Sequence, residues 1–253
     1  MKITILGCGT STGVPVIGCL CHICRSADPR NNRTRASIFI ETEGVNILVD
    51  TSTDLRNQAL ARDISRIDAV LFTHPHADHI HGIDELRTFN MIQGEAAIPC
   101  FGNRPTIDRI ETIFSYIFSK ERHGGWRPNL ELSVVDAPFQ LSGITIHPIT
   151  INHGATTILG YRIHDAAYLT DCSGIPESSL AELRGLNTLI VGALRQKPHP
   201  SHFSIREALD VSANLAPRRT VFTHLSHTVD YEGESAALPD GVELAYDGMV
   251  LEM

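Results

Sequence analysis

The sequence predicts a single α/β domain, because predicted strands and helices alternate along a chain with no visible internal division. Short apolar runs rich in β-branched residues are typical of buried strands, and they alternate with segments whose apolar residues recur at helical spacing. The 253 residues suffice for one large domain or two small ones. Since no repeat, linker or low-complexity segment divides them, we expect one domain over residues 1–253.

The first half of the chain is expected to form five strands and three helices. A turn at Glu43-Gly44 joins the second and third strands, and Thr53 is expected to cap the helix that follows. The predicted strands are Lys2–Leu6, Ser37–Glu41, Val45–Val49, Ile67–Phe72 and Ile98–Phe101. The predicted helices are Thr53–Asp63, Ile83–Thr88 and Pro105–Phe118.

The second half is expected to be richer in strands. They are Leu130–Val135, Ile144–Ile151, Thr157–Ile163, Ala167–Leu169, Thr188–Val191, Arg219–Phe222, Val242–Ala245 and Met249–Glu252. The predicted helices are Pro176–Leu183 and Ile205–Leu215. Before them, the polar, Gly-rich segment SKERHGGWRPN indicates an exposed loop, which we interpret as part of a lid over residues 103–129; a solvated connector is the alternative.

Composition narrows the class of protein. Hydrophobic residues make up 42% of the chain and charged residues 20%, which is ordinary for a soluble globular protein. The N-terminal apolar run is too short for a signal peptide, and no stretch approaches the ~18 apolar residues of a membrane span, so we expect a cytoplasmic protein without a membrane partner. A net charge of −8 argues against binding along an extended nucleic acid and favours a small substrate.

Metal-ligand chemistry is concentrated where the predicted strand Ile67–Phe72 ends. Imidazole nitrogen and carboxylate oxygen bind zinc, manganese and iron, and the ends of strands are where open α/β sheets place their sites. A solvated His-rich loop is a poor alternative, because ligand-type residues fill nearly every second position. The cluster consists of His74, His76, Asp78, His79 and His81.

Three later strands also end in a residue that can bind a metal: His153, Asp171 and His224. Each alone is better explained as structural. Together with His74, His76, Asp78 and His79 they form a set of seven, which exceeds the needs of one metal. Two metals a few ångströms apart would use such a set, with a carboxylate bridging them. Asp171 can bridge, because it carries two oxygens.

A second cluster is formed by cysteines. The chain has six, and in a cytosolic protein a disulfide framework is not expected. Cys19, Cys21 and Cys24 form C-x-C-x-x-C within a Cys-rich loop at residues 18–25. Three thiolates need a fourth ligand to close a tetrahedral zinc site. Buried or free thiols are the alternative.

The T-H-x-H-x-D-H motif, followed by a lone His, an Asp and a final His, resembles the metallo-β-lactamase superfamily over essentially the whole chain. The resemblance implies a four-layer αββα sandwich with two metals along one edge. By analogy, one metal takes His74, His76 and His153, the other takes Asp78, His79 and His224, and Asp171 bridges them. Asp50 matches an acidic residue of the family that supports the ligands from behind.

A narrower resemblance is to the phosphodiesterase type of the carbon–phosphorus lyase pathway, which opens 5-phosphoribosyl 1,2-cyclic phosphate. The matching pieces are LGCGTSTGVPVIGCLCHIC, THPHADH, the lone His153, LTDCSG, FTHLSH and YDGM. This resemblance implies a structural zinc held by Cys19, Cys21, Cys24 and His227. Residues 103–129 look longer than the corresponding stretch of that enzyme type, which leaves the substrate open because lids set specificity.

These features together predict a metal-dependent phosphodiesterase that cleaves a small phosphate ester, cyclic or acyclic. Two zinc, manganese or iron ions would activate a water for attack on phosphorus, with Asp78 and Asp171 as catalytic ligands. A general acid is needed for the leaving group. His202 is our candidate by resemblance, with His199 as the alternative. By resemblance, His81 lies outside the ligand set.

Other functions remain open from the sequence. A tRNA 3′-processing nuclease shares the site type but needs a basic arm, and a glyoxalase II-type thioester hydrolase would leave the cysteines unexplained. A β-lactamase is a weaker alternative, because nothing else in the sequence points to a β-lactam substrate. A non-enzymatic, carrier or chaperone-like role, as in the pyrroloquinoline quinone biosynthesis protein of the superfamily, also fits the cysteines. Arg33 and Arg35 are weak candidates for phosphate binding. Relatives often dimerise, so a homodimer is an open expectation.

Overall fold

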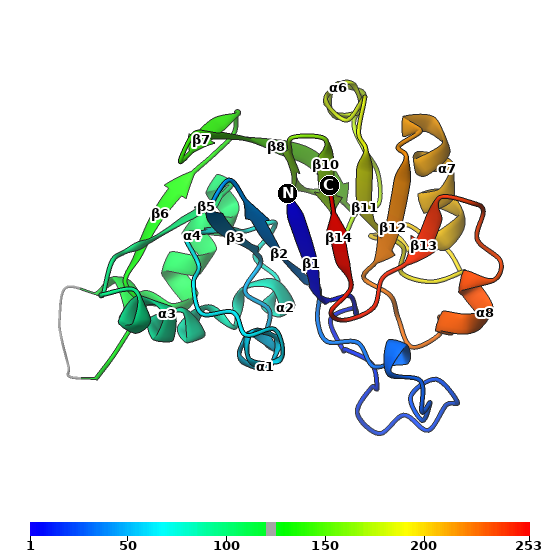
Figure 1. The fold of residues 1–253 in the computed structure, drawn as a ribbon, viewed down its shortest axis with the longest axis horizontal. Helices are drawn as coiled ribbons and strands as arrows, with labels where there is room; N and C mark the ends of the chain where they lie inside the picture. Colours follow the sequence, from blue (N-terminus) through cyan, green and yellow to red (C-terminus); the bar gives the residue numbers. More distant parts are fainter. Residues whose placement is uncertain (120–124) are drawn as a thin grey trace.

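The computed structural model describes residues 1–119 and 125–253 of the protein. Two seven-stranded sheets pack face to face, and helices cover the outer face of each sheet (Figure 1). The expected four-layer αββα sandwich is therefore confirmed. Among the described residues, no helix has both the length and the apolar character required to cross a bilayer.

The first sheet is antiparallel on one side and parallel on the other. In spatial order it contains β14 (Val250–Glu252), β1 (Lys2–Gly7), β2 (Ser37–Thr42), β3 (Val45–Val49), β4 (Ala69–Leu71), β5 (Ile98–Gly102) and β6 (Leu130–Val134). Pairing is antiparallel from β14 to β3 and parallel from β3 to β6. Its helices are α1 (Leu55–Ala61), α2 (Ala77–Ile80), α3 (Leu86–Ile92), α4 (Arg104–Ile113) and α5 (Ser115–Phe118).

The second sheet repeats this division. In spatial order it contains β13 (Val242–Leu244), β12 (Arg219–Thr223), β11 (Thr188–Gly192), β10 (Ala166–Leu169), β9 (Thr156–Ile163), β8 (Ile144–His153) and β7 (Phe139–Leu141). Strands β10 to β13 pair parallel and β7 to β10 antiparallel. Its helices are α6 (Glu177–Glu182), α7 (Ile205–Leu215) and α8 (Tyr231–Ser235).

Neighbouring residues of the central strands point into different layers of the core. Leu71 of β4 packs between the two sheets, whereas Val70 packs under the helices of the first sheet. Likewise, Ile190 of β11 faces the space between the sheets and Leu189 faces the outer helices. Because both faces of these strands are buried, their sequences are continuous apolar runs rather than alternating ones.

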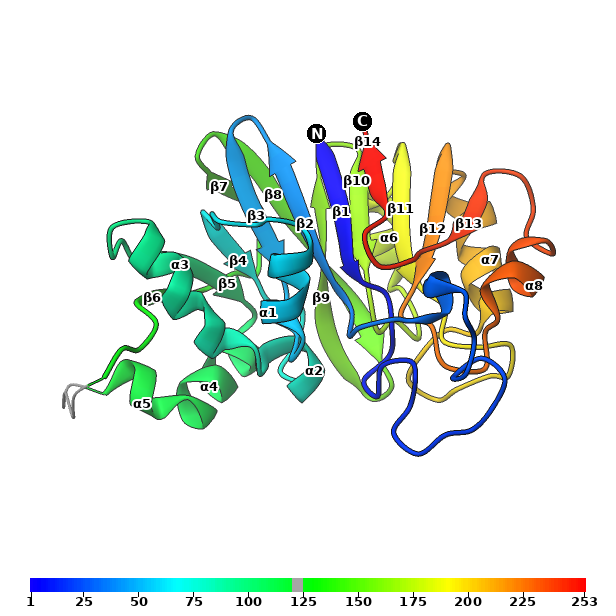
Figure 2. The same cartoon turned by 60° about the horizontal axis from the view of Figure 1, so that its bottom comes forward.

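The loops that follow the parallel strands lie at one end of the sandwich. In Figure 2, α2, which follows β4, and the loop that follows β11 both lie at the lower end of the molecule. Strands of the two sheets that are far apart in sequence therefore end near one another, as expected for sites in α/β folds.

Several helix boundaries differ from the sequence prediction. Helix α1 begins at Leu55 and its N-cap residue is Asp54, not Thr53, with no side-chain capping bond. The Asp54 carboxylate instead accepts hydrogen bonds from Arg35. The single helix expected over 105–118 is divided at Phe114 into α4 and α5. Strand β7, the one-turn helix α2 and helix α8 were not predicted, because each is only three to five residues long.

The expected lid over 103–129 is helical in its first part. Asn103 caps α4, and its side-chain oxygen accepts from the Thr106 amide. Residues 120–124 of the predicted loop lie outside the described residues.

Candidate metal centre

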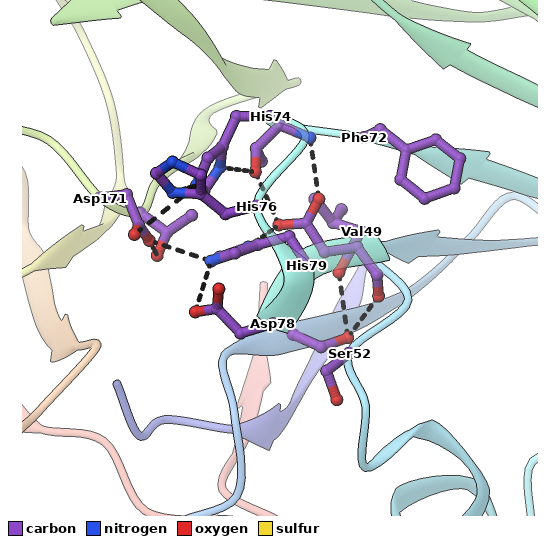
Figure 3. Close-up of polar contacts among 12 residues, drawn as sticks. Val49, Ser52, Phe72, His74, His76, Asp78, His79 and Asp171 are labelled. Atoms are coloured by element: carbon purple, nitrogen blue, oxygen red, sulfur yellow. Dashed lines mark hydrogen bonds and ion pairs between the residues drawn. The ribbon is translucent and has the colours of Figure 1, made fainter. Parts of the chain in front are cut away.

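All seven residues expected to bind catalytic metals lie together at one end of the sandwich. Figure 3 shows five of them: His74, His76, Asp78, His79 and Asp171. The seven residues form two adjacent groups, and within each group the ligand atoms lie within 4.8 Å of one another. One group is His74, His76 and His153, and the other is Asp78, His79, Asp171 and His224. Six of the seven side chains are buried, and His76 is exposed.

The one-turn helix α2 explains how a single loop supplies four of these residues. His74 and His76 precede the helix, the backbone of His76 is extended, and the Nε2 of His74 lies 3.0 Å from the Nδ1 of His76. The helix then turns the chain, so that Asp78 and His79 enter the buried group. The Nε2 of His79 lies 3.2 Å from the Oδ2 of Asp78.

Three acidic or basic residues at strand ends adopt a left-handed backbone. Asp50 has φ 64°, Asp171 has φ 55° and His224 has φ 56°. Such a conformation is costly for a residue with a Cβ, and it concentrates at functional sites where the surroundings impose it. Each of the three residues lies within two positions of the end of its strand, and its side chain is buried.

Asp50 organises the site from behind the ligands. It is fully buried and accepts hydrogen bonds from the Thr73 amide at 2.8 Å, the Thr73 hydroxyl at 2.7 Å and the Nδ1 of His79 at 2.7 Å. Burial raises the pKa of Asp50, although His79 and Thr73 oppose the shift. The bond leaves the Nε2 of His79 as the nitrogen directed toward Asp78 and Asp171.

Burial and neighbouring charges shift the pKa values of Asp171 and His79 in opposite directions. Burial alone would raise the pKa of Asp171, but the neighbouring His224 and His79 hold it well below its ordinary value. Burial would lower the pKa of His79, but the nearby Asp171 and Asp50 carboxylates raise this pKa well above its ordinary value. Asp171 is therefore a carboxylate surrounded by imidazoles, which is the chemistry required of a bridging ligand.

Buried nitrogen atoms without hydrogen bonds show that a metal fits this set. The Nε2 atoms of His79 and His224 are buried and make no hydrogen bond among the described residues. They lie 3.4 Å and 3.3 Å from the two carboxylate oxygens of Asp171. Two ligands of one ion, each about 2.0–2.2 Å from it, are separated by comparable distances. The donor set of imidazoles and carboxylates suits zinc, manganese or iron.

His202 lies beside this set and His199 lies further out. The Nδ1 of His202 is buried and has no hydrogen-bond partner among the described residues. It lies 3.8 Å from the Oδ2 of Asp171. Its ring stacks on that of His224 at a centroid distance of 4.9 Å. Burial and the nearby His224 lower the pKa of His202 to about 3. The ring of His199 is 5.0 Å from that of His202.

His81 and the two arginines take no part in the two ligand groups. His81 is exposed at the end of α2 and packs edge-on against Phe114 at 5.7 Å. Arg33 is only 1% exposed, and its guanidinium donates to the carbonyls of Ser226 and Val229 at 3.0 and 2.8 Å. Phosphate binding by Arg33 is thus wrong, because its donors are used inside the protein. Arg35 forms an ion pair with Asp54 at 3.1 Å.

The cysteine cluster meets a histidine as expected. The Nδ1 of His227 lies 3.4, 3.6 and 3.7 Å from the sulfurs of Cys19, Cys21 and Cys24. These four residues form one group with the composition of a closed tetrahedral zinc site. The Cys24 amide and His227 lower the pKa of Cys21 to about 6, which favours the thiolate.

The two sites share one loop. His224 of the first site and His227 of the second are three residues apart, and Arg33 holds the carbonyls of Ser226 and Val229 around them. Sequence reasoning missed this role of Arg33. Its sequence neighbourhood, PRNNRTR, is polar and gives no signal that distinguishes a buried arginine from an exposed one.

Comparisons with known proteins agree with this architecture. Residues 45–225 match a family model described as β-lactamase superfamily domain. The chain is 40% identical to an octanoyltransferase of Porphyromonas gingivalis over 98% of its length, although it spans about half (51%) of that relative. The crystal structure of a diphosphatase from the PhnP family superposes with a TM-score of 0.93 and 41% identity, covering 100% of this chain and 97% of the other. The zinc-bound PqqB of Methylobacterium extorquens shares the fold over 100% of both chains, with a TM-score of 0.81 and 20% identity.

Proposed function

The chain belongs to the β-lactamase superfamily, and from that membership we propose that it is a metal-dependent hydrolase of small phosphate diesters. The observation that carries this proposal is the position of Asp171, whose two carboxylate oxygens face His79 and His224. Its Oδ2 also lies 3.8 Å from the Nε2 of His74, which belongs to the neighbouring group. A carboxylate shared between two ligand groups is the arrangement that two-metal hydrolases use.

The ligand groups divide between two ions in the proposed active state. His74, His76 and His153 would hold one, Asp78, His79 and His224 the other, and Asp171 both. When bound, divalent cations would lower the pKa of a coordinated water and neutralise charge on phosphoryl oxygens. Zinc, manganese and iron all suit these ligands. A further structural zinc at Cys19, Cys21, Cys24 and His227 would bring the total to about three.

The protein's own residues have separate roles in this proposal. Asp50 fixes the orientation of the His79 ring, so that its Nε2 stays directed into the site. His202 is placed to supply a proton to the leaving oxygen, because its ring lies against both His153 and His224. An anionic phosphate beside this ring would favour its protonated form.

A second candidate reaction is the hydrolysis of a phosphoric anhydride. The observation that favours it is the 41% identity, over the full chain, to the PhnP-family diphosphatase. Attack on phosphorus and protonation of the leaving oxygen are common to both reactions, so the same residues would serve. The transferase name of the Porphyromonas gingivalis relative is not carried over, because that protein is about twice as long as this chain.

The test is hydrolysis of bis(p-nitrophenyl) phosphate by protein loaded with manganese or zinc, with elemental analysis of the same sample. Turnover with about three metals per chain supports the proposal. Absence of turnover with the two-metal site filled would overturn it and favour thioester substrates. Absence of turnover with a single zinc would favour the carrier role. The variant Asp136→Ala, on an exposed loop away from the ligands, is the matched control for substitutions of aspartates in the site.

A further inference from the structure

A threonine stands directly before a candidate metal ligand at or just after the end of three strands, namely Thr73, Thr170 and Thr223. All three side chains are fully buried. The hydroxyl of Thr73 donates to Asp50, as described above. The hydroxyl of Thr170 instead donates to the Oδ1 of Asp171 at 2.6 Å. A buried hydroxyl is thus bonded directly to the carboxylate that both ligand groups face.

The backbone of Asp171 is held from several sides. The Nδ1 of His153 donates to its carbonyl at 2.7 Å, and the Phe203 amide donates to the carbonyl of Cys172, the next residue, at 2.6 Å. A Cβ added at Gly192 of β11 would lie 3.1 Å from the Asp171 amide nitrogen, so β11 packs closely on this segment. With the backbone held, the carboxylate can still rotate about χ2, which is a broad torsion in aspartate. Its orientation therefore depends on what its oxygens contact.

The two oxygens of Asp171 have different surroundings. Oδ1 accepts from Thr170 and lies 3.4 Å from the Nε2 of His79. Oδ2 lies 3.3 Å from the Nε2 of His224 and 3.8 Å from the Nε2 of His74. His224 and His74 belong to different ligand groups. Oδ2 is therefore the oxygen that approaches both groups, while Oδ1 is engaged by the threonine.

We propose that Thr170 is a positioning residue for the shared carboxylate, whose hydroxyl holds Oδ1 and so keeps Oδ2 of Asp171 directed at both ligand groups. This inference rests on the two-metal site of the proposed function but not on its substrate. An ionised carboxylate only accepts hydrogen bonds, so the hydroxyl must be the donor. Hydrogen bonds to an ionised group are also stronger than those between neutral groups, which suits this bond to an orienting role.

The alternative is that this bond only satisfies a buried hydroxyl. Buried polar groups need partners in any protein, and losing such a bond lowers stability wherever it lies. A positioning role predicts more than that. Without the bond the carboxylate can rotate, so the ion that depends on Oδ2 should bind more weakly even in a well-folded protein. Metal binding, not stability, distinguishes the two explanations.

The experiment is a titration with manganese of protein that retains its structural zinc. The electron paramagnetic resonance signal of free manganese gives the number of bound ions and their dissociation constants without any substrate. Thr170→Val, which replaces the hydroxyl by a methyl group, is expected to bind the second ion roughly tenfold more weakly than the wild type. Thr170→Ser keeps a hydroxyl, so both constants should stay within about twofold.

Thr220→Val is the matched control. Thr220 is also buried, and its hydroxyl shares a hydrogen bond of 2.7 Å with that of Ser212. It lies at the opposite end of β12 from His224. Both valine variants should melt at a lower temperature than the wild type, but only Thr170→Val should change manganese binding. If Thr170→Val does not fold, Thr170→Ala compared with Thr170→Ser supplies the same contrast.

A second measurement reports on the shared ligand itself. Two manganese ions that share a carboxylate couple their spins, and the low-temperature resonance spectrum differs from that of isolated ions. With two ions bound, the wild type and Thr170→Ser should show the coupled spectrum. Thr170→Val should show a larger share of uncoupled ions. This readout does not depend on hydrolysis.

Three results would overturn the positioning role of Thr170. These are wild-type constants and an unchanged spectrum in Thr170→Val, an equal loss in Thr170→Ser, and an equal loss in Thr220→Val. A wild type that binds two ions but hydrolyses no diester would overturn the proposed function alone, because the titration still decides the role of Thr170. A wild type that binds fewer than two ions in the two ligand groups, with manganese or zinc, would overturn both proposals.

Discussion

The Nδ1 of His79 lies 2.7 Å from the Oδ2 of Asp50, and both side chains are completely buried. The contact joins the end of β3 to the turn of α2, two segments 29 residues apart in the chain. It fixes the tautomer of His79 and thereby the direction of the nitrogen that faces Asp78 and Asp171. Four consequences of the structure can be tested.

Asp50→Asn should weaken metal binding while leaving the fold in place. The amide group cannot accept from both Thr73 and His79 as the carboxylate does, so the His79 ring loses its fixed orientation. Loss of such a supporting partner lowers metal affinity roughly 10- to 100-fold. Competition with a chromogenic chelator measures the change, and Asp136→Asn is the control. An affinity equal to that of the wild type would contradict this role of Asp50.

Asp171→Ala should reduce hydrolysis to the level of the metal-free protein. It removes the carboxylate that both ligand groups face, so the ions cannot be held at a fixed separation. The circular dichroism spectrum should resemble that of the wild type, because the apolar core between the sheets is untouched. Retained activity in a metal-replete sample would remove the bridging assignment.

Cys21→Ala should lose about one zinc per chain and lower the thermal stability, while the two-metal chemistry persists. The Cys21 sulfur is one of three that surround His227, and a structural zinc contributes directly to folding. Elemental analysis and thermal melting measure both effects. Leu20→Ala changes an exposed residue of the same loop and should alter neither. The same metal count in Cys21→Ala and wild type would exclude the zinc site.

Arg33→Met should destabilise the protein by about 3 kcal/mol, because buried acceptors lose their partner. Its guanidinium donates to Ser226, Val229 and the Asn31 side chain inside the protein. Arg35→Met should cost about 1 kcal/mol or less, since its ion pair with Asp54 is partly exposed. Urea unfolding compares the two. A higher KM for a phosphate ester in Arg33→Met, without loss of stability, would restore the phosphate-binding interpretation.

Local patterns in the sequence were sufficient for much of the fold. The apolar runs before His74, Asp171 and His224 predicted strands that the structure contains, because residues buried on both faces leave a continuous apolar signal. Short elements such as α2 and β7 left no such signal. The cap expected at Thr53 was wrong, because the helix begins two residues later than predicted and Asp54 stands at the N-cap position.

The sequence by itself determined the chemistry of the protein: which side chains can bind metals, and that each follows a strand. These properties depend on residue type and on spacing over a few positions. Only the tertiary structure decided which of them meet. The approach of His202 to Asp171, the buried position of Arg33 and the contact of Asp50 with His79 all depend on segments remote in the chain. Such contacts are fixed by the packing of two sheets, which no local pattern records.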